Sequence, residues 1–395
     1  MPITKIQFQP GVNRENTSYA NKGGYYACDK VRFRSGYPEQ IGGWINYSVG
    51  NTFVGIPRSL FTWTTTDSES LLGFGTTQKY YVEYNGQYQD ITPERVTKTA
   101  TQFATTLDSK LVTVTVSGHG AAVNTWITFT GSLTFNGVTI SGSYEIVRAL
   151  TGNTFNIAVS SAATSTGTSA TSLSVTFDIN AGTSTYTTNT AGWGIGPWSN
   201  GGWGESSVDI STTTGTQIQL WSQSNFGSDL IFAPRGNSIY WWTKDTTTFA
   251  SGVTLNEYAA TIPKSTKTAT FGSGDTTITV PDNIGINAGA TITGVGIPLG
   301  TYVTTSYLGG TSVPISAATT APSSGTYTFS HSGYFVPNTT NQIIASDINQ
   351  FAIAIGANPY DPTDFNSDFN PMLVRWSDQT NPVEWVPETT NQSGE

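Results

Sequence analysis

The sequence predicts an all-β protein, a partial β-propeller scaffold that carries two small inserted modules of β-sandwich or barrel-like type. Three observations predict this class. Charged residues make up only 11% of the 395 residues, and Ser, Thr, Asn and 42 glycines take their place; Thr favours strands. The aromatic content of 12% argues against disorder. Apolar and polar residues alternate between turn signals, and no stretch shows a sustained helical period.

The scaffold is predicted from hairpin-sized units that join an apolar strand to a strand with aromatic residues. Residues 78–93 (QKYYVEYNGQYQDITP) form the clearest unit, because Asn85 and Gly86 tolerate the positive φ angles of a two-residue hairpin turn. A strand, a turn and a second strand recur at residues 229–243, 350–360 and 372–387. Recurring units of this size are typical of propeller blades.

Two stretches of different character interrupt these units. Residues 97–185 and 264–333 alternate β-branched with polar residues between frequent Gly and Asn turns, as small sandwiches and barrels do. Insertion at a hairpin tip costs little, because loop-closure entropy grows only logarithmically with loop length. The core of the second module is expected from Ile278, Val280, Ile284, Ile292, Val295, Ile297 and Val303. The predicted segments are scaffold 1–96, module 97–185, scaffold 186–263, module 264–333 and scaffold 334–395.

Tryptophan is concentrated in the predicted scaffold. Three residues fall in a Gly-Trp run at 191–207, which we interpret as an irregular linker with aromatic packing; stacking of sugars on exposed Trp is the alternative. The candidate packing aromatics are Trp193, Trp198, Trp203, Trp241, Trp242, Trp376 and Trp385.

The distribution of charge disfavours a nucleic-acid-binding protein. The net charge is −9; residues 1–95 contribute +1 (9 basic, 8 acidic), and the remainder contributes −10 (8 basic, 18 acidic). Binding through counterion release needs clustered Lys and Arg. An acidic surface could let DNA pass without retaining it, or could simply keep the protein soluble.

One basic cluster stands out near the start of the chain. Lys30, Arg32 and Arg34 alternate along a short predicted strand and therefore share the face opposite Val31 and Phe33. This strand is the candidate contact with an acidic neighbouring subunit; a solvated strand face is the alternative.

Few residues suggest catalysis, and the sequence predicts neither an enzyme nor a cofactor or metal site. His119 lies between glycines in SGHGA, which favours a turn role, and His331 has no acidic neighbour in the sequence. Asp361, Asp364 and Asp368 are close together, but their Pro and Asn neighbours favour turn and cap roles over calcium binding or glycoside cleavage.

The compartment is predicted from the absence of several signals. Cys28 is the only cysteine, so an intrachain disulfide is excluded. No apolar run approaches the roughly 20 residues of a membrane span, and the N-terminal residues lack the apolar region of a signal peptide. We expect synthesis and assembly in a reducing cytoplasm.

Taken together, these segments resemble the tail nozzle family of short-tailed bacteriophages, also called tail tubular protein B or phage stabilisation protein. The segments that carry the resemblance are 10–44, 80–95 with its strand–turn–Asp-Ile-Thr-Pro ending, 191–207, 220–242 and 374–395. They cover about half of the chain outside the two modules.

The resemblance implies a structural protein of the virion tail. Members of the family form a ring, expected to be sixfold, below the portal and the adaptor, and DNA leaves through its channel; tail fibres or spikes are further partners, and contact with the host surface is compatible with this place. A receptor-binding or glycan-degrading tail protein is the alternative, and a secreted adhesin is a third reading. Because the chain stops just after a blade motif, the propeller is expected to be open, with an unpaired edge strand that further chain or a neighbouring subunit completes.

Overall fold

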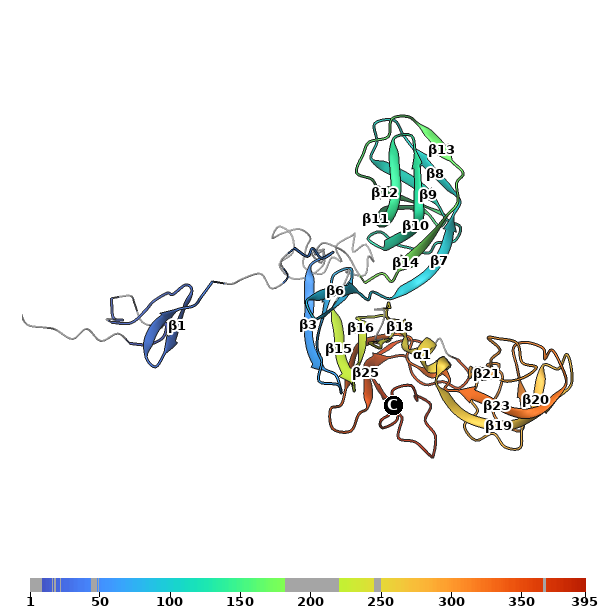
Figure 1. Ribbon diagram of the computed structural model, residues 1–395. Helices are drawn as coiled ribbons and strands as arrows, with labels where there is room; N and C mark the ends of the chain where they lie inside the picture. The colour runs from blue at the N-terminus through green and yellow to red at the C-terminus, as the bar shows by residue number, and fades with distance from the viewer. Residues whose placement is uncertain are drawn as a thin grey trace, which may run out of the picture. The chain divides into compact units, whose positions relative to one another are not determined.

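Nearly all regular structure among the described residues is antiparallel β-sheet, which confirms the predicted all-β class (Figure 1). The chain forms two compact units, Met1–Thr52 and Phe53–Glu395. In the part described, the helical elements are α1 (Leu255–Thr261) and the 3-10 turn η1 (Gly333–Phe335), and no helix is long and apolar enough to cross a membrane. The computed structural model describes residues 9–15, 17, 19–21, 23–43, 48, 50–181, 220–244, 250–364 and 367–395.

In the described part of the first unit, β1 (Val31–Arg34) and β2 (Tyr37–Gln40) form a hairpin. Ser35 and Gly36 make its turn, and both have positive φ angles, of 50° and 84°, as a two-residue hairpin turn requires.

The scaffold of the second unit consists of three antiparallel sheets, each formed from consecutive strands. Sheet 1 contains β3 (Pro57–Thr64), β4 (Ser70–Thr76), β5 (Tyr80–Tyr84) and β6 (Gln87–Asp90). Sheet 2 contains β15 (Trp221–Phe226), β16 (Asp229–Pro234), β17 (Tyr240–Trp242) and β18 (Val253–Thr254). Sheet 3 contains β24 (Thr340–Ala345), β25 (Ala352–Ala357) and β26 (Asn370–Trp376). The predicted Asn85-Gly86 turn joins β5 to β6, with φ angles of 51° and 77°.

Sheet 2 is buried on both faces, because sheets 1 and 3 pack against its two sides (Figure 1). Side chains of a strand alternate between the two faces of its sheet. Accordingly, Phe232 and Trp242 join the core shared with sheet 1, whereas Ile231 and Trp241 join the core shared with sheet 3. The tandem Trp241-Trp242 therefore fills two separate cores, in a stack like that of adjacent propeller blades.

Module 1 is an eight-stranded antiparallel sheet that folds over one apolar core. The long strand β11 carries register shifts and takes part in both halves of the sheet, which is how bulges bend a sheet. Four large side chains of this core are fully buried, at 0% exposure: Phe103, Ile127, Phe155 and Phe177. The strands are β7 (Glu94–Ala100), β8 (Gln102–Thr105), β9 (Leu111–Thr115), β10 (Trp126–Phe135), β11 (Val138–Thr151), β12 (Thr154–Ala158), β13 (Gly167–Ser169) and β14 (Leu173–Asp178).

Module 2 is a five-stranded sheet with long loops. The strands are β19 (Pro263–Phe271), β20 (Thr277–Thr279), β21 (Ile292–Thr293), β22 (Ser312–Pro314) and β23 (Ser323–Ser330). Most of the predicted core residues are buried, but Ile284 and Val295 are 72% and 80% exposed, so their assignment to the core was wrong. Both lie in loops between strands, where the alternation of a strand no longer determines which side chains point inward.

The predicted second strands in residues 350–360 and 372–387 are also wrong: β25 ends at Ala357, and no strand follows it before Tyr360. β26 is present, but the chain after Trp376 forms turns and irregular backbone. Pro382 and Pro387 cannot donate to a sheet ladder. Trp385 is nevertheless 1% exposed, because its ring packs into the core between sheets 2 and 3 and its Nε1 donates to Pro382 O.

Candidate functional site

Both modules join the scaffold through a two-stranded antiparallel ribbon. In module 1, β7 pairs with β14, and Asp178 lies opposite Glu94 at the base. In module 2, β19 pairs with β23, and Ser330 lies opposite Pro263 at the base. The first and last strands of each module are therefore neighbours, so each module can extend from the scaffold without separating the strands that flank it.

A buried lysine lies at the base of the first ribbon. Lys79 directly precedes β5, and its Nζ lies 2.6 Å from Asp90 Oδ2 and 2.9 Å from Asp178 Oδ2. The Lys79 side chain is only 6% exposed, and its ammonium group lies 5.4 Å from the centre of the Trp126 ring. We call Lys79, Asp90 and Asp178 the Lys79 cluster. Because Asp90 ends β6 and Asp178 ends β14, the cluster connects sheet 1 to module 1.

The electrostatics of the Lys79 cluster follow from two carboxylates sharing one ammonium group. Burial raises the pKa of Asp178 to about 6, because the loss of hydration outweighs the attraction of Lys79. Burial alone would lower the pKa of Lys79, but the two carboxylates reverse this effect and raise it. Lys79 therefore stays charged, and Asp178 is the member that takes up a proton in weakly acidic solution.

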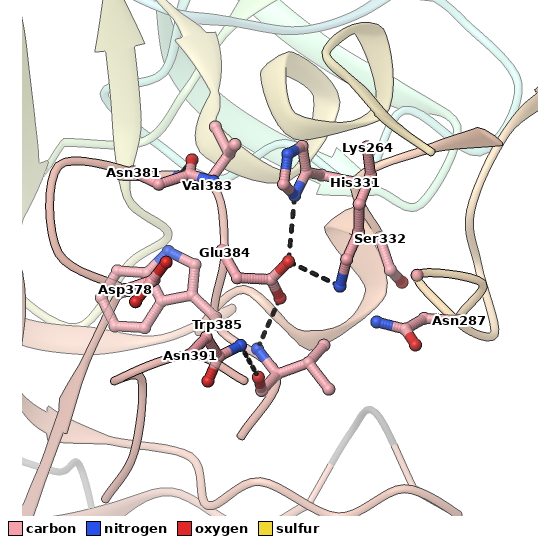
Figure 2. Close-up of polar contacts among 12 residues, drawn as sticks. Lys264, Asn287, His331, Ser332, Asp378, Asn381, Val383, Glu384, Trp385 and Asn391 are labelled. Atoms are coloured by element: carbon pink, nitrogen blue, oxygen red, sulfur yellow. Dashed lines mark hydrogen bonds and ion pairs between the residues drawn. The ribbon is translucent and has the colours of Figure 1, made fainter. Parts of the chain in front are cut away.

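A second buried lysine lies at the base of the other ribbon (Figure 2). Lys264 follows the first residue of β19, and its Nζ lies 2.6 Å from Glu384 Oε2 and 3.0 Å from Glu388 Oε1. Glu384 Oε2 also accepts a hydrogen bond from His331 Nδ1 (3.1 Å), and Glu384 Oε1 accepts one from Val386 N (3.1 Å). We call Lys264, His331, Glu384 and Glu388 the Lys264 cluster; it connects module 2 to the C-terminal part of the scaffold.

Glu384 remains ionised in spite of its burial. Burial by itself would raise the pKa of this carboxyl, but the hydrogen bond from His331 and the charge of Lys264 together hold the pKa below its ordinary value. A buried carboxylate with two hydrogen-bond donors and a cation is well satisfied. The Lys264 cluster is thus an ionic junction at neutral pH.

The His331–Glu384 pair has the acid–histidine half of a nucleophilic site, but the adjacent hydroxyl is used elsewhere. Ser332 Oγ donates to the backbone oxygen of Ala288, and Ser330 Oγ donates to the backbone oxygen of His331. Nucleophilic catalysis requires a hydroxyl or thiol hydrogen-bonded to the ring, and these hydroxyls instead fix loops of module 2. The arrangement supports a structural junction.

A groove of about 580 Å³ lies beside the Lys264 cluster. One wall comes from module 2 loops and includes Ile284, Asn287 and Leu308; the other comes from the scaffold and includes Tyr360 and Glu388. Its size falls within the range of pockets that hold small molecules, roughly 300–1,000 Å³.

The two histidines have separate structural settings. His119 is 1% exposed: Ala121 N donates to its Nδ1 (3.0 Å), its Nε2 lies 3.0 Å from Thr151 O, and its ring stacks on Phe177. The predicted turn role is consistent with these contacts. For His331, the acidic partner that the sequence lacks nearby is supplied by Glu384, 53 residues away.

Asp361 caps a turn, as its neighbours predict. Its Oδ1 accepts hydrogen bonds from Thr363 N and Oγ1, both at 2.7 Å, and these bonds lower its pKa. In the described ranges, no three His, Cys, Asp or Glu side chains gather with a geometry that could hold a metal ion.

The predicted basic strand and the predicted aromatics have different surroundings. Lys30, Arg32 and Arg34 are exposed, but Lys30 precedes β1, and Arg32 Nε lies 3.0 Å from Glu39 on β2 of the same hairpin. Trp241, Trp242 and Trp385 are buried, and Trp376 is half-buried with Nε1 donating to Gln392 O (2.7 Å). Trp193, Trp198 and Trp203 lie outside the described residues.

Sequence reasoning missed both lysine clusters. One available signal was the position of each lysine: Lys79 borders the apolar strand Tyr80–Tyr84, and Lys264 stands where the scaffold becomes module 2. A lysine at such a boundary is rarely buried without a carboxylate partner. The identity of the partners could not be read from the sequence.

The fold and these junctions define the class: an all-β protein whose blade-like scaffold carries two ribbon-mounted modules. No protein-family model matches the chain, and no curated protein matches it. Among solved structures, phage phi92 endosialidase matches with a TM-score of 0.20 and 10% sequence identity, over 83% of this chain and 56% of that chain. At this TM-score the likeness says nothing about what this chain does.

Proposed function

We propose that this chain is a structural component of the tail nozzle of a short-tailed phage. In this proposal the scaffold sheets form part of a ring, expected to be sixfold, below the portal and the adaptor, and the ring retains DNA and lets it leave. The modules extend from the ring toward tail fibres or the host surface. The protein acts in the virion tail.

The observation that carries the proposal is the use of buried charge at both module bases. Lys79 and Lys264 each bind two carboxylates and thereby fix a module to the scaffold. Buried ion pairs that join two parts of a chain can favour one arrangement of those parts, because separating them leaves a buried charge without its partner. We expect a protein that carries load during DNA release to need such junctions between its parts.

The segment with the Asp-Ile-Thr-Pro ending supports the same reading, because its residues have structural roles. Asp90 belongs to the Lys79 cluster, Ile91 is 0% exposed, and Thr92 Oγ1 accepts a hydrogen bond from Tyr80 N (2.9 Å). One of the five segments that carry the resemblance to nozzle proteins therefore takes part in the junction between a blade-like sheet and a module.

Electron cryomicroscopy of virions that encode this chain tests the proposal. Thr97 and Thr176 are register partners, so an Asn-Gly turn replacing residues 98–175 closes the ribbon and removes module 1. Val96 and Phe177, which pack on the removed core, are changed to Thr in the same variant. We expect a ring below the portal in wild-type virions and in virions of this variant. Density on the outer side of the ring should be present in the wild type and missing in the variant. Density for the chain only at appendage tips would refute the nozzle.

The alternative, a glycan-degrading tail protein, needs its own assay. Release of sugars from host envelope material by the purified chain, lost on Asp361→Asn or Asp364→Asn, would favour that alternative over the nozzle.

A further inference from the structure

The groove beside the Lys264 cluster has fixed walls. Glu388 Oε1 accepts hydrogen bonds from Lys264 Nζ (3.0 Å) and from Asn287 Nδ2 (3.1 Å). Asn287 belongs to module 2 and Glu388 to the scaffold, so these bonds hold the two walls at a set separation. A preformed groove binds a ligand without the entropic cost of ordering its own walls.

The lining of the groove combines apolar surface with hydrogen-bonding groups. Ile284 and Leu308 are 72% and 77% exposed at its rim. The ring of Tyr360 is half-buried, and its centroid lies 5.0 Å from the centroid of the Phe335 ring. Thr389 and Thr390 also line this space, and the Thr390 hydroxyl donates to Glu388 Oε2 (3.5 Å). Apolar faces beside hydroxyl and amide groups match a sugar, whose ring has C–H faces and a rim of hydroxyls.

Among the polar atoms that line the groove, Asn287 Oδ1 and the Tyr360 hydroxyl have no hydrogen-bond partner within the described residues. Because Asn287 Nδ2 is held by Glu388, the amide is oriented and its oxygen is left to accept from a ligand. Burial, followed by the nearby charge of Glu388, raises the pKa of the Tyr360 phenol, so its hydroxyl keeps its proton and can donate. Asn287 belongs to the module 2 wall and Tyr360 to the scaffold wall, so the groove offers a ligand one acceptor and one donor.

The charge of the site selects against anionic ligands. Lys264 contributes +1, and Glu384 and Glu388 contribute −2, which leaves a net charge of −1 beside the groove. The cation is enclosed by its two carboxylates and is only 11% exposed. A carboxylated sugar such as a sialic acid would meet an uncompensated negative charge.

From this geometry we infer that the groove between module 2 and the scaffold binds a short neutral oligosaccharide. Asn287 and Tyr360 orient its hydroxyls, and Ile284, Leu308 and the Tyr360 ring contact its C–H faces. The inference goes beyond the structural role proposed above and does not depend on it, since a nozzle or a tail appendage could carry such a groove.

Saturation-transfer NMR with the full chain tests the inference. The ligands are a panel of neutral oligosaccharides, each with its sialylated counterpart, such as lactose and sialyllactose. We expect transfer to at least one neutral glycan and a weaker signal for its sialylated partner. Absence of transfer to every neutral glycan, or equal binding of the sialylated forms, would overturn the inference.

Two conservative variants locate the binding site. Tyr360→Phe removes one hydroxyl and retains the ring, so the Kd should rise roughly 2- to 10-fold, as loss of one hydrogen bond predicts. Tyr302→Phe removes a hydroxyl from an exposed tyrosine of module 2 outside the groove and should leave the Kd unchanged. Unfolding midpoints equal to wild type confirm that both variants fold. A Kd that Tyr360→Phe leaves unchanged would contradict the assignment. So would a groove that a second copy of the chain occupies and closes to sugars.

Discussion

Lys264 Nζ lies 2.6 Å from Glu384 Oε2, and this buried contact connects the first strand of module 2 to a scaffold segment near the C-terminus. The sequence shows that Lys264 stands where the scaffold becomes module 2, but no local pattern marks Glu384 as its partner. The pair matters because it does for module 2 what Lys79 and Asp178 do for module 1. The eight-stranded module 1 and the five-stranded module 2 are therefore attached to the scaffold in the same way. Each has a paired ribbon with a lysine and two carboxylates at its base.

Removing Lys79 should destabilise the protein strongly. Lys79→Met leaves Asp178 buried without its cation, and loss of one partner of a buried pair typically costs about 3–5 kcal/mol. The free energy of unfolding from urea titrations measures the change. Lys110→Met, at an exposed lysine of module 1, is the control and should stay within about 0.5 kcal/mol of wild type. A similarly small effect of Lys79→Met would mean that the cluster does not hold the module.

Neutralising Glu384 should loosen module 2 in particular. Glu384→Gln removes the charge that faces Lys264 and His331, and we expect a loss of about 3 kcal/mol. Hydrogen exchange should show faster opening of β19 and β23 than of module 1. Asp347→Asn, at an exposed scaffold position, is the matched control. Uniform acceleration across both modules would instead indicate global destabilisation.

The stability of the protein should carry a pH signature from Asp178. In the unfolded chain its carboxyl titrates near 3.8, whereas in the folded chain its pKa is about 6. Between these values the folded state holds a proton that the unfolded state has lost, so the free energy of unfolding falls as the pH rises from about 4 to about 6. The full difference corresponds to roughly 3 kcal/mol. Asp178→Asn should flatten this part of the profile, measured by urea midpoints.

Glu384 should have the opposite signature. Its pKa is held below the ordinary value of 4.5, so its contribution is complete above that pH and is lost as the pH falls through the folded pKa. In the Asp178→Asn variant, lowering the pH should therefore speed hydrogen exchange in module 2 and leave hydrogen exchange at the base of module 1 unchanged. Measuring hydrogen exchange at about pH 4 and about pH 6 distinguishes the responses of the two modules. An acid-induced change confined to module 1 would contradict the assignment.

Gly75 should tolerate no side chain, because sheets 1 and 2 meet at this residue. A Cβ there would lie 2.3 Å from Trp221 Cδ1, whose ring also donates through Nε1 to Thr76 O (2.6 Å). Gly75→Ala should therefore displace Trp221 and cost about 1–3 kcal/mol through overpacking. Gly152→Ala places a methyl group in open space and is the control. The thermal unfolding midpoint measures both, and equal midpoints would show that the two sheets separate easily.

Local patterns were sufficient for the parts of the fold that depend on neighbours in the chain. The turn at Asn85-Gly86 follows from the tolerance of these residues for positive φ. The all-β class follows from alternation, and alternation also predicts that Trp241 and Trp242 point to opposite faces. Where the chain leaves its strands, the same reasoning failed: Ile284 is exposed in a loop, and Trp385 is buried without a strand.

The sequence by itself determined the β class, the hairpins at 78–93 and 229–243 and most of the core of module 2, because these depend on periodicity and turn chemistry within a few residues. Only the tertiary structure decided which charges meet. Lys79 and Asp178 are 99 residues apart, and His331 and Glu384 are 53 apart. Such pairs form because the ribbons return each module to its base and the sheets stack there. A charge that is buried in this way needs a partner of opposite charge. No local sequence pattern identifies that partner.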